Sequence, residues 1–199
     1  MIVIAGGIGA GKSVVARILR LKGFGVFDCD LEARRMMEEE GELIACVRNI
    51  AGEDVYDSAN RLDRALLASR LFADPEIRRS INREVHSAVR KRIEEWMGSS
   101  KRNLFVETAI GGESGIAAMA GEIWLVDAPE ELRIERVMER DRRPEEQIKS
   151  IIDAQRKEEE RLAESGARVV RLINDGKRSL LQQIEKELKT LNENIQQQC

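Results

Sequence analysis

The sequence predicts an α/β fold in which a five-stranded parallel sheet carries helices on both faces. Five short apolar runs of four to six residues are separated by longer segments with helical periodicity. A glycine cluster joins the first run to the first helical segment. Short apolar strands that alternate with helices form parallel sheets with both faces covered. The five runs are residues 2–5, 25–28, 103–108, 122–127 and 168–173.

The first 28 residues predict a strand, a glycine loop, a helix and a second strand. Residues 2–5 form a short β-branched run. Apolar residues from Val14 to Leu21 then recur at helical spacing. Gly23 fits the end of this helix, because glycine readily adopts the left-handed backbone of a helix C-terminus. With the short run 25–28, the opening segment reads as a βαβ unit.

Residues 31–97 contain almost no strand signals and predict a helical insertion. Its clearest pattern places six apolar residues near one helical face: Ile77, Ile81, Val85, Val89, Ile93 and Trp96. After the strands at 103–108 and 122–127, the Arg-rich segment 130–164 is helical, and Pro144 suits the first turn of a helix. A final amphipathic helix begins near Leu180 and follows the last strand.

The composition argues against several classes of function. Among 199 residues, 33 are Lys or Arg and 36 are Asp or Glu, so the net charge is 33 − 36 = −3. Duplex-binding proteins usually carry a basic surface, so nucleic acid is not expected as a partner. No apolar run reaches the roughly 18 residues of a membrane span, and no basic segment precedes the first apolar run.

The cysteines Cys29, Cys46 and Cys199 are too scattered for a zinc site or a disulfide framework. We therefore expect a cytoplasmic protein that does not bind membranes. No sequence pattern specifies its oligomeric state.

The glycine loop matches the phosphate-binding pattern G-x-x-x-x-G-K-[ST] at residues 6–13. A chain of this length yields on the order of 0.01 accidental matches at typical glycine frequency. Glycines let backbone N–H groups turn inward around phosphate oxygens, and the following helix N-terminus adds positive potential. The motif predicts that Lys12 reaches the β- and γ-phosphates of ATP and that the Ser13 hydroxyl ligates Mg²⁺. The alternative is a plain glycine-rich turn before a helix.

Two carboxylates follow the second predicted strand, in Asp28-Cys29-Asp30. The carboxyl edge of a parallel sheet is where α/β proteins bind ligands. Strand alternation would point both carboxylates the same way. One could take a proton from an acceptor hydroxyl, and the other could organise Mg²⁺-bound water. The alternative is that Asp30 only caps the following helix.

The Arg-rich segment places Arg133, Arg136 and Arg140 near one helical face. Guanidinium groups over a bound triphosphate would neutralise charge that develops on a transferred phosphoryl group. A solvated, salt-bridged face is the competing interpretation, because residues 133–161 hold nine basic and nine acidic residues. Gln155 continues an apolar face, where its amide needs a polar partner.

Further segments resemble the dephospho-coenzyme A kinase family in order and spacing, from the phosphate loop almost to the C-terminus. They are Asp28-Cys29-Asp30 with Ala33-Arg34, Leu62-Asp63-Arg64-Ala65-Leu66-Leu67, Phe72-Ala73-Asp74-Pro75, Glu113-Ser114-Gly115, Val126-Asp127-Ala128-Pro129, Arg136 with Arg140-Asp141, Gln155, and Asn174-Asp175-Gly176. The resemblance implies transfer of the ATP γ-phosphate to the ribose 3′-hydroxyl of dephospho-CoA, the last step of coenzyme A synthesis. It also implies a P-loop NTPase fold.

The resemblance also implies roles for individual residues. Asp30 matches the proposed base, and Asp28, Lys12 and Arg140 complete the implied catalytic set. The implied acceptor-binding residues are Asp30, Arg34, Asp63, Arg64, His86 and Glu113. The implied ATP-binding residues are Gly7, Ile8, Gly9, Ala10, Gly11, Lys12, Ser13, Val14, Arg136, Arg140, Asn174 and Gly176, with Ser13 as the metal ligand.

By the same resemblance, the chain divides into three parts. Residues 1–30, 101–130 and 165–199 would form the nucleotide-binding core, 31–100 a helical acceptor-binding insertion, and 131–164 a helical lid. Departures from the family pattern are Ala5, Ser87 and the pair Gly111-Gly112, and the glycine pair is expected to loosen its segment.

The departures keep two alternatives open: a P-loop kinase for another nucleotide or sugar, and a degenerate homologue that only binds ATP. A nucleotide-dependent switch or binding protein is a third. The Asn-Lys-x-Asp pattern of guanine-specific switches does not occur.

Overall fold

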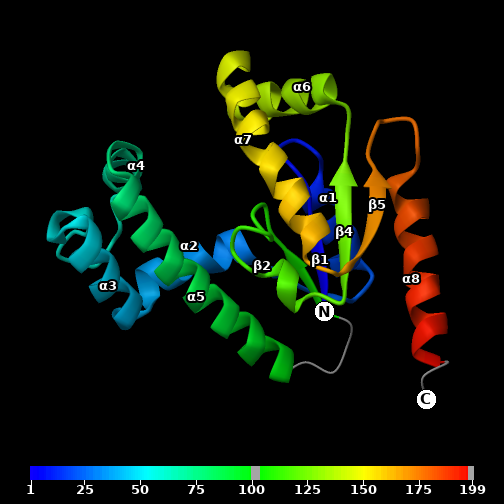
Figure 1. The fold of residues 1–199 in the computed structure, drawn as a ribbon, viewed down its shortest axis with the longest axis horizontal. Coiled ribbons are helices and arrows are strands. Elements are labelled where there is room, and N and C mark those ends of the chain that lie inside the picture. Colours follow the sequence, from blue (N-terminus) through cyan, green and yellow to red (C-terminus); the bar gives the residue numbers. More distant parts are fainter. Residues whose placement is uncertain (100–103, 197–199) are drawn as a thin grey trace. The chain divides into compact units, whose positions relative to one another are not determined.

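The computed structural model describes residues 1–99 and 104–196, which leaves Asn103 and Cys199 outside the described residues. The chain forms two compact units, each described by itself below (Figure 1). The first comprises Met1–Val26 and Arg102–Cys199, and the second comprises Phe27–Lys101. The second unit is a single continuous insertion in the chain of the first.

The sheet has five strands in the order β2-β3-β1-β4-β5. The central strand β1 pairs in parallel with β3 and β4, and β4 pairs in parallel with β5. The predicted fold class is confirmed. The strands are β1 (Ile2–Ala5), β2 (Gly25–Asp28), β3 (Leu104–Glu107), β4 (Glu122–Asp127) and β5 (Arg168–Ile173).

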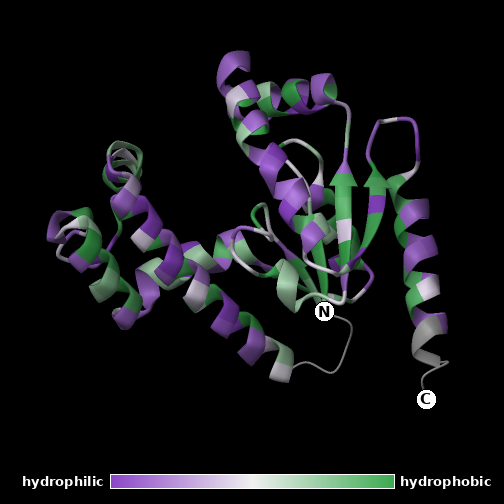
Figure 2. Cartoon of the chain, viewed as in Figure 1, coloured by the Kyte–Doolittle hydropathy of each residue, from purple (hydrophilic) through white to green (hydrophobic). Residues whose placement is uncertain are grey.

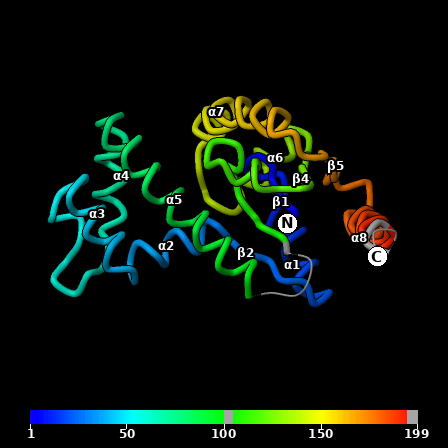
Figure 3. The backbone as a smooth tube through the Cα atoms, turned by 60° about the horizontal axis from the view of Figure 1, so that its bottom comes forward, coloured from blue at the N-terminus to red at the C-terminus, as the bar shows by residue number. Residues whose placement is uncertain are grey.

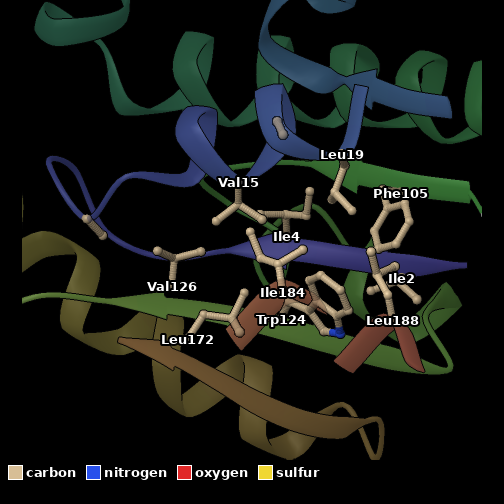
Figure 4. Packing of buried hydrophobic residues seen from close by; sticks show 12 residues of the cluster. Ile2, Ile4, Val15, Leu19, Phe105, Trp124, Val126, Leu172, Ile184 and Leu188 are labelled. Atoms are coloured by element: carbon tan, nitrogen blue, oxygen red, sulfur yellow. The ribbon is translucent and has the colours of Figure 1, made fainter. Parts of the chain in front are cut away.

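The core of the first unit lies between the sheet and the helices α1 (Lys12–Leu21) and α8 (Leu180–Gln196). Ile4 of β1, Trp124 of β4 and Ile184 of α8 are fully buried there (Figure 4). Apolar burial of this kind is the main stabilising contribution to a fold. The strands are the most hydrophobic part of the unit, and polar residues occupy the outer faces of the helices (Figure 2).

The opposite face of the sheet is covered by α7 (Glu145–Glu164), which follows α6 (Glu130–Asp141) (Figure 3). Val3 alternates with Ile2 and Ile4 and therefore points to this second face. A short 3₁₀ turn, Ala117–Met119, lies between β3 and β4. The predicted arrangement of helices on both faces is thus confirmed.

The second unit contains α2 (Cys29–Glu39), α3 (Gly41–Ala51), a 3₁₀ turn (Glu53–Val55), α4 (Arg64–Ala73) and α5 (Pro75–Ser99). The long α5 packs against α2, α3 and α4. Ile81, Val89 and Ile93 of the predicted apolar face are buried. The expected helical character of 31–97 is confirmed.

The junction after β2 differs from the sequence expectation. Asp28 is the last residue of β2, and α2 already begins at Cys29. Strand alternation therefore does not extend to Asp30, and the expectation that it aligns the two carboxylates is wrong. Because Asp28 ends a strand and Asp30 lies in the first turn of a helix, helix geometry sets the direction of the second side chain.

Candidate nucleotide and acceptor sites

The phosphate loop joins the carboxyl end of β1 to the N-terminus of α1. Its backbone at Gly9 and Gly11 is left-handed, with φ of 76° and 104°. Only glycine adopts this region without strain. A side chain at Gly11 would also overlap the amide of Asn174, and one at Gly9 would meet the backbone of Arg133. Two of the motif glycines are thus required both for backbone conformation and for close packing.

Side chains from other elements hold the carbonyl groups of this loop. Asn174, at the end of β5, donates from Nδ2 to Ala10 O over 2.8 Å. Arg136 of α6 donates to Gly9 O over 3.4 Å and to Asn174 O over 3.1 Å. The structure therefore brings together Arg136, Asn174, Gly9 and Ala10, which the sequence had placed around one nucleotide.

With these carbonyls held, the loop offers donors to an anion. The N–H groups of Gly9, Gly11 and Ser13 have no acceptor within the described part of the chain. Lys12 donates from Nζ to Gly6 O over 2.8 Å and to Gly7 O over 3.3 Å. Backbone N–H groups at a helix N-terminus, with an adjacent ammonium group, form a site for phosphate.

The Ser13 hydroxyl has no hydrogen-bond partner among residues 1–99 and 104–196, and Ser13 is exposed. A hydroxyl oxygen is a suitable hard ligand for Mg²⁺, which usually keeps waters and takes further oxygens from substrate phosphates. Within the described ranges, no group of three or more His, Cys, Asp or Glu side chains could hold a metal ion. Ser13 therefore fits a site completed by the substrate.

Arg140 makes no hydrogen bond to a described residue of the loop in this structure. Its guanidinium group binds both oxygens of Asp141, over 2.7 and 2.9 Å, and this bond lowers the pKa of the Asp141 carboxyl.

Two other predicted ATP-binding residues, Val14 and Gly176, lie in different elements. Val14 is exposed on α1. Gly176 has a φ of 76° in the turn after β5, where the Asp175 carboxylate accepts the N–H groups of Lys177 and Arg178.

Gln155 and Arg133 also contact the loop. The sequence had placed Arg133 with the arginines over a bound triphosphate, but it had not indicated that either residue binds the loop backbone. Gln155 of α7 accepts the Ile8 N–H, and Arg133 of α6 donates to Ile8 O. A cavity of about 220 Å³ lies beside these two residues and is lined also by Gly6, Gly7 and Ala109. The sequence indicated the hydrogen bond between Ile8 and Gln155 only indirectly, because a glutamine on an apolar helix face needs a polar partner.

The segment around Glu113 is anchored to α7. Both the Gly112 and the Glu113 N–H donate to the Glu158 carboxylate, the latter over 3.1 Å. Glu113 also pairs with Arg161 at 3.5 Å. A Cβ at Gly112 would lie 2.6 Å from Arg161 Cβ. The glycine pair therefore permits close packing on α7, and the expectation that it loosens the segment is wrong.

In the second unit, the predicted acceptor residues lie at helix starts and on helix faces. Asp30 is exposed in the first turn of α2. Asp28 caps this helix by accepting the Leu31 N–H over 3.0 Å, so the capping role considered for Asp30 belongs to Asp28. Asp63 caps α4 by accepting the Leu66 N–H over 2.9 Å.

The basic acceptor candidates of the second unit, Arg34, Arg64 and His86, have different surroundings. Arg64 pairs with Glu38 at 2.9 Å, whereas Arg34 is exposed on α2 with no ion pair to a described residue. His86 is half-buried on α5. These are the residue types that recognise phosphates and hydroxyl groups.

Comparison with known proteins decides between the kinase classes. The dephospho-CoA kinase family matches residues 1–179. The chain belongs to the dephospho-CoA kinase family. It is 35% identical over 199 residues to the dephospho-CoA kinase of Bacteroides fragilis (strain YCH46), covering 98% of this chain and 95% of that one. It is 34% identical over 161 residues to the dephospho-CoA kinase of Methylococcus capsulatus, covering 80% and 81%.

Solved structures show which proteins share the fold of this chain. The protein TT1252 from Thermus thermophilus has a TM-score of 0.77 and 34% identity, and the match covers 97% of this chain and 96% of that one. The dephospho-CoA kinase from Campylobacter jejuni shares the fold, with a TM-score of 0.69 at 23% identity and 97% coverage of both chains. Shikimate kinase from Acinetobacter baumannii, at a TM-score of 0.51 and 17% identity with 97% and 93% coverage, shares the P-loop kinase fold.

Among residues 1–99 and 104–196, no helix combines the length and the apolar composition that crossing a bilayer requires.

Proposed function

We propose that this protein transfers the γ-phosphate of ATP to the ribose 3′-hydroxyl of dephospho-CoA, the last step of coenzyme A synthesis. The observation that carries the proposal is the family match over residues 1–179, which includes an intact phosphate loop. ATP hydrolysis without transfer would waste the nucleotide, so the active site must also exclude water.

The phosphate side of the proposed site is the loop of residues 7–14. Its amides would hold the ATP phosphates, and Lys12 would exchange its contacts with Gly6 O and Gly7 O for phosphate oxygens. This exchange is favourable because an ammonium group binds an anionic oxygen more strongly than a neutral carbonyl. Ser13 would hold Mg²⁺, which supplies charge neutralisation on the β- and γ-phosphates.

The acceptor-binding residues that we propose are Asp30, Arg34, Asp63, Arg64 and His86 in the second unit, and Glu113 in the first. The Asp30 side chain is exposed and makes no hydrogen bond to a described residue, so its carboxylate would be able to accept the proton of the 3′-hydroxyl. Asp28 would support the acceptor or the metal while it caps α2. Arg34, Asp63, Arg64 and His86 would bind the remainder of dephospho-CoA.

Residues 131–164 are proposed to act as a lid, with the core at 1–30, 101–130 and 165–199 and the acceptor-binding insertion at 31–100. Arg140 would leave Asp141 to bind the nucleotide, and Gly176 would lie by the adenine with Asn174. Arg136 would fix the loop. A cytoplasmic location is part of the proposal, because ATP is the substrate.

The test is a kinase assay with Mg·ATP and a panel of acceptors, in which ADP release is followed. Dephospho-CoA should stimulate ADP release, and the product should carry phosphate at the 3′ position. Stimulation by a different nucleotide or sugar would replace the proposed acceptor. A folded protein that binds ATP and releases no acceptor-dependent ADP would be a degenerate homologue, and the proposal would be wrong.

A further inference from the structure

Two neighbouring peptide groups at the tip of the phosphate loop are held by side chains from two different helices. The Ile8 N–H donates to Gln155 Oε1 of α7 over 2.7 Å. The Ile8 carbonyl accepts from Arg133 Nε of α6 over 2.9 Å. Ile8 is thereby bound on both sides by residues more than 120 positions away in the sequence.

The first of these bonds orients the peptide between Gly7 and Ile8. All peptide bonds of the described chain are trans, so the carbonyl of one residue and the N–H of the next point in opposite directions. Gly7 O faces the interior of the loop, where it accepts from Ala10 N–H over 3.2 Å and from Lys12 Nζ over 3.3 Å. Gln155 accepts the outward N–H of the same peptide and so fixes its plane.

The second bond orients the peptide between Ile8 and Gly9. Because Arg133 holds Ile8 O on one side, the Gly9 N–H must point to the other side. That N–H has no acceptor within the described residues, and it belongs to the donors available to a phosphate. A left-handed glycine follows, so without Arg133 the peptide could turn over at low steric cost.

Arg133 is placed for this contact rather than for an ion pair. Arg133 is buried, with 9% of the residue exposed, and it forms no ion pair with a carboxylate of the described residues. Its guanidinium group lies against Gly7 so closely that a Cβ at that position would overlap with Nη2. A buried polar group needs a hydrogen-bond partner, and the partner that Arg133 has is the Ile8 carbonyl.

We propose that Arg133 and Gln155 are positioning residues for ATP: together they set the Gly7–Ile8 and Ile8–Gly9 peptides so that the Gly9 N–H faces the nucleotide phosphates. The inference rests on the proposed function, in which this loop binds ATP. It predicts an effect on ATP binding that is separate from binding of the acceptor.

Two substitutions with side chains of equal length test the hydrogen bond from Arg133 Nε to Ile8 O. Arg133→Gln places an amide nitrogen the same number of bonds from Cα as Arg Nε and can still donate to Ile8 O. Arg133→Met places a methyl group there instead. We expect Arg133→Met to raise the KM for ATP and the Kd for Mg·ADP about 10- to 100-fold, with the KM for dephospho-CoA within about twofold of the wild-type value. Arg133→Gln should recover most of the loss.

Gln155 gives a second pair that does not depend on the folding of an Arg133 variant. Gln155→Glu retains an oxygen acceptor at the same distance along the side chain, and Gln155→Met does not. Gln155→Met should weaken Mg·ADP binding by about 10-fold or more, and Gln155→Glu by less. Lys157→Met, at an exposed position of α7, is the matched control and should bind Mg·ADP like the wild type.

The outcomes separate this inference from the proposed function. A wild-type protein that binds no Mg·ADP would contradict the proposed function itself. Normal Mg·ADP binding by both methionine variants would overturn the positioning role. Equal losses in Arg133→Gln and Arg133→Met would also overturn it, because the donated hydrogen bond would then not be the cause. A parallel rise in both KM values with a lower Tm would assign the residues a purely structural role.

Discussion

Asn174 Nδ2 donates a hydrogen bond to Ala10 O over 2.8 Å and joins the end of β5 to the phosphate loop. Because the peptide is trans, this bond also turns the Gly11 N–H away from Asn174 and toward the anion site. The same asparagine accepts from Arg136 through its backbone carbonyl. One side chain thus links the two predicted nucleotide-binding segments.

Asn174→Leu should therefore weaken ATP binding. The substitution keeps the approximate volume and removes the donor, so we expect the KM for ATP to rise about 10-fold and the KM for dephospho-CoA to stay nearly constant. Steady-state kinetics with each substrate varied measures both. Asn192→Leu, at an exposed position of α8, is the control. An unchanged KM for ATP would mean that the bond does not organise the loop.

Gly112→Ala should destabilise the protein. The added Cβ would lie 2.6 Å from Arg161 Cβ and 3.2 Å from a Glu158 oxygen, so α7 or the turn must shift. Overpacking of this kind costs roughly 1–3 kcal/mol, which corresponds to a Tm lower by about 2–12 °C. Gly121→Ala is the control, because no heavy atom lies within 4 Å of its Cβ. Equal Tm values for the two variants would contradict the packing argument.

Glu158 should make stability depend on pH. Burial raises the pKa of its carboxyl, although the N–H groups of Gly112 and Glu113 oppose that shift. A carboxyl with a raised folded pKa stabilises the fold fully below its unfolded pKa, and this contribution is lost as the pH rises through the folded value.

The ordinary pKa of a Glu carboxyl is 4.5, and the pKa of Glu158 in the folded protein is higher. As the pH rises from below 4.5 through this higher pKa, the free energy of unfolding of the wild-type protein should fall relative to that of Glu158→Gln. Urea unfolding of both proteins between pH 4 and 7 measures the difference, and the subtraction cancels the titration of other carboxyls. A difference that grows in the opposite direction would show that the carboxylate is stabilised in the fold.

Asp30→Asn tests the proposed base. The amide cannot accept the 3′-hydroxyl proton, so turnover should fall by at least about 100-fold with the KM for ATP nearly unchanged. Asp153→Asn on the exposed face of α7 should retain activity and is the control. Normal turnover by Asp30→Asn would assign proton removal to another group.

Ser13→Ala tests the proposed metal ligand. Loss of the hydroxyl should raise the Mg²⁺ concentration for half-maximal activity by about 10-fold, and chelation of Mg²⁺ should abolish transfer in both proteins. Activity titrated with Mg²⁺ at fixed ATP measures the shift. Superimposable titration curves would exclude Ser13 as a ligand.

The local pattern was enough to predict most of the fold. The ranges 2–5, 25–28, 122–127 and 168–173 coincide with strands, because each is a short apolar run bounded by glycine or polar residues. The phosphate loop was equally clear, since its glycines, Lys12 and Ser13 are adjacent in the chain. The role of Asp30 as the base for the 3′-hydroxyl stays a prediction, which rests on the sequence and on the family resemblance.

Tertiary structure decided the contacts between distant segments. Sequence alone could not assign the helix cap to Asp28 instead of Asp30, because the choice depends on where the backbone changes from extended to helical. From the sequence, the pair Gly111-Gly112 predicted a loose segment. In the structure, packing on α7 and hydrogen bonds to the carboxylate of Glu158 hold this turn. Periodicity places Arg133 and Gln155 on helix faces, but which peptide each one binds depends on how α6 and α7 pack against the loop. The sequence determined the elements and the phosphate-binding motif through local interactions, and only the packing of distant elements determined which backbone groups remain available to bind a ligand.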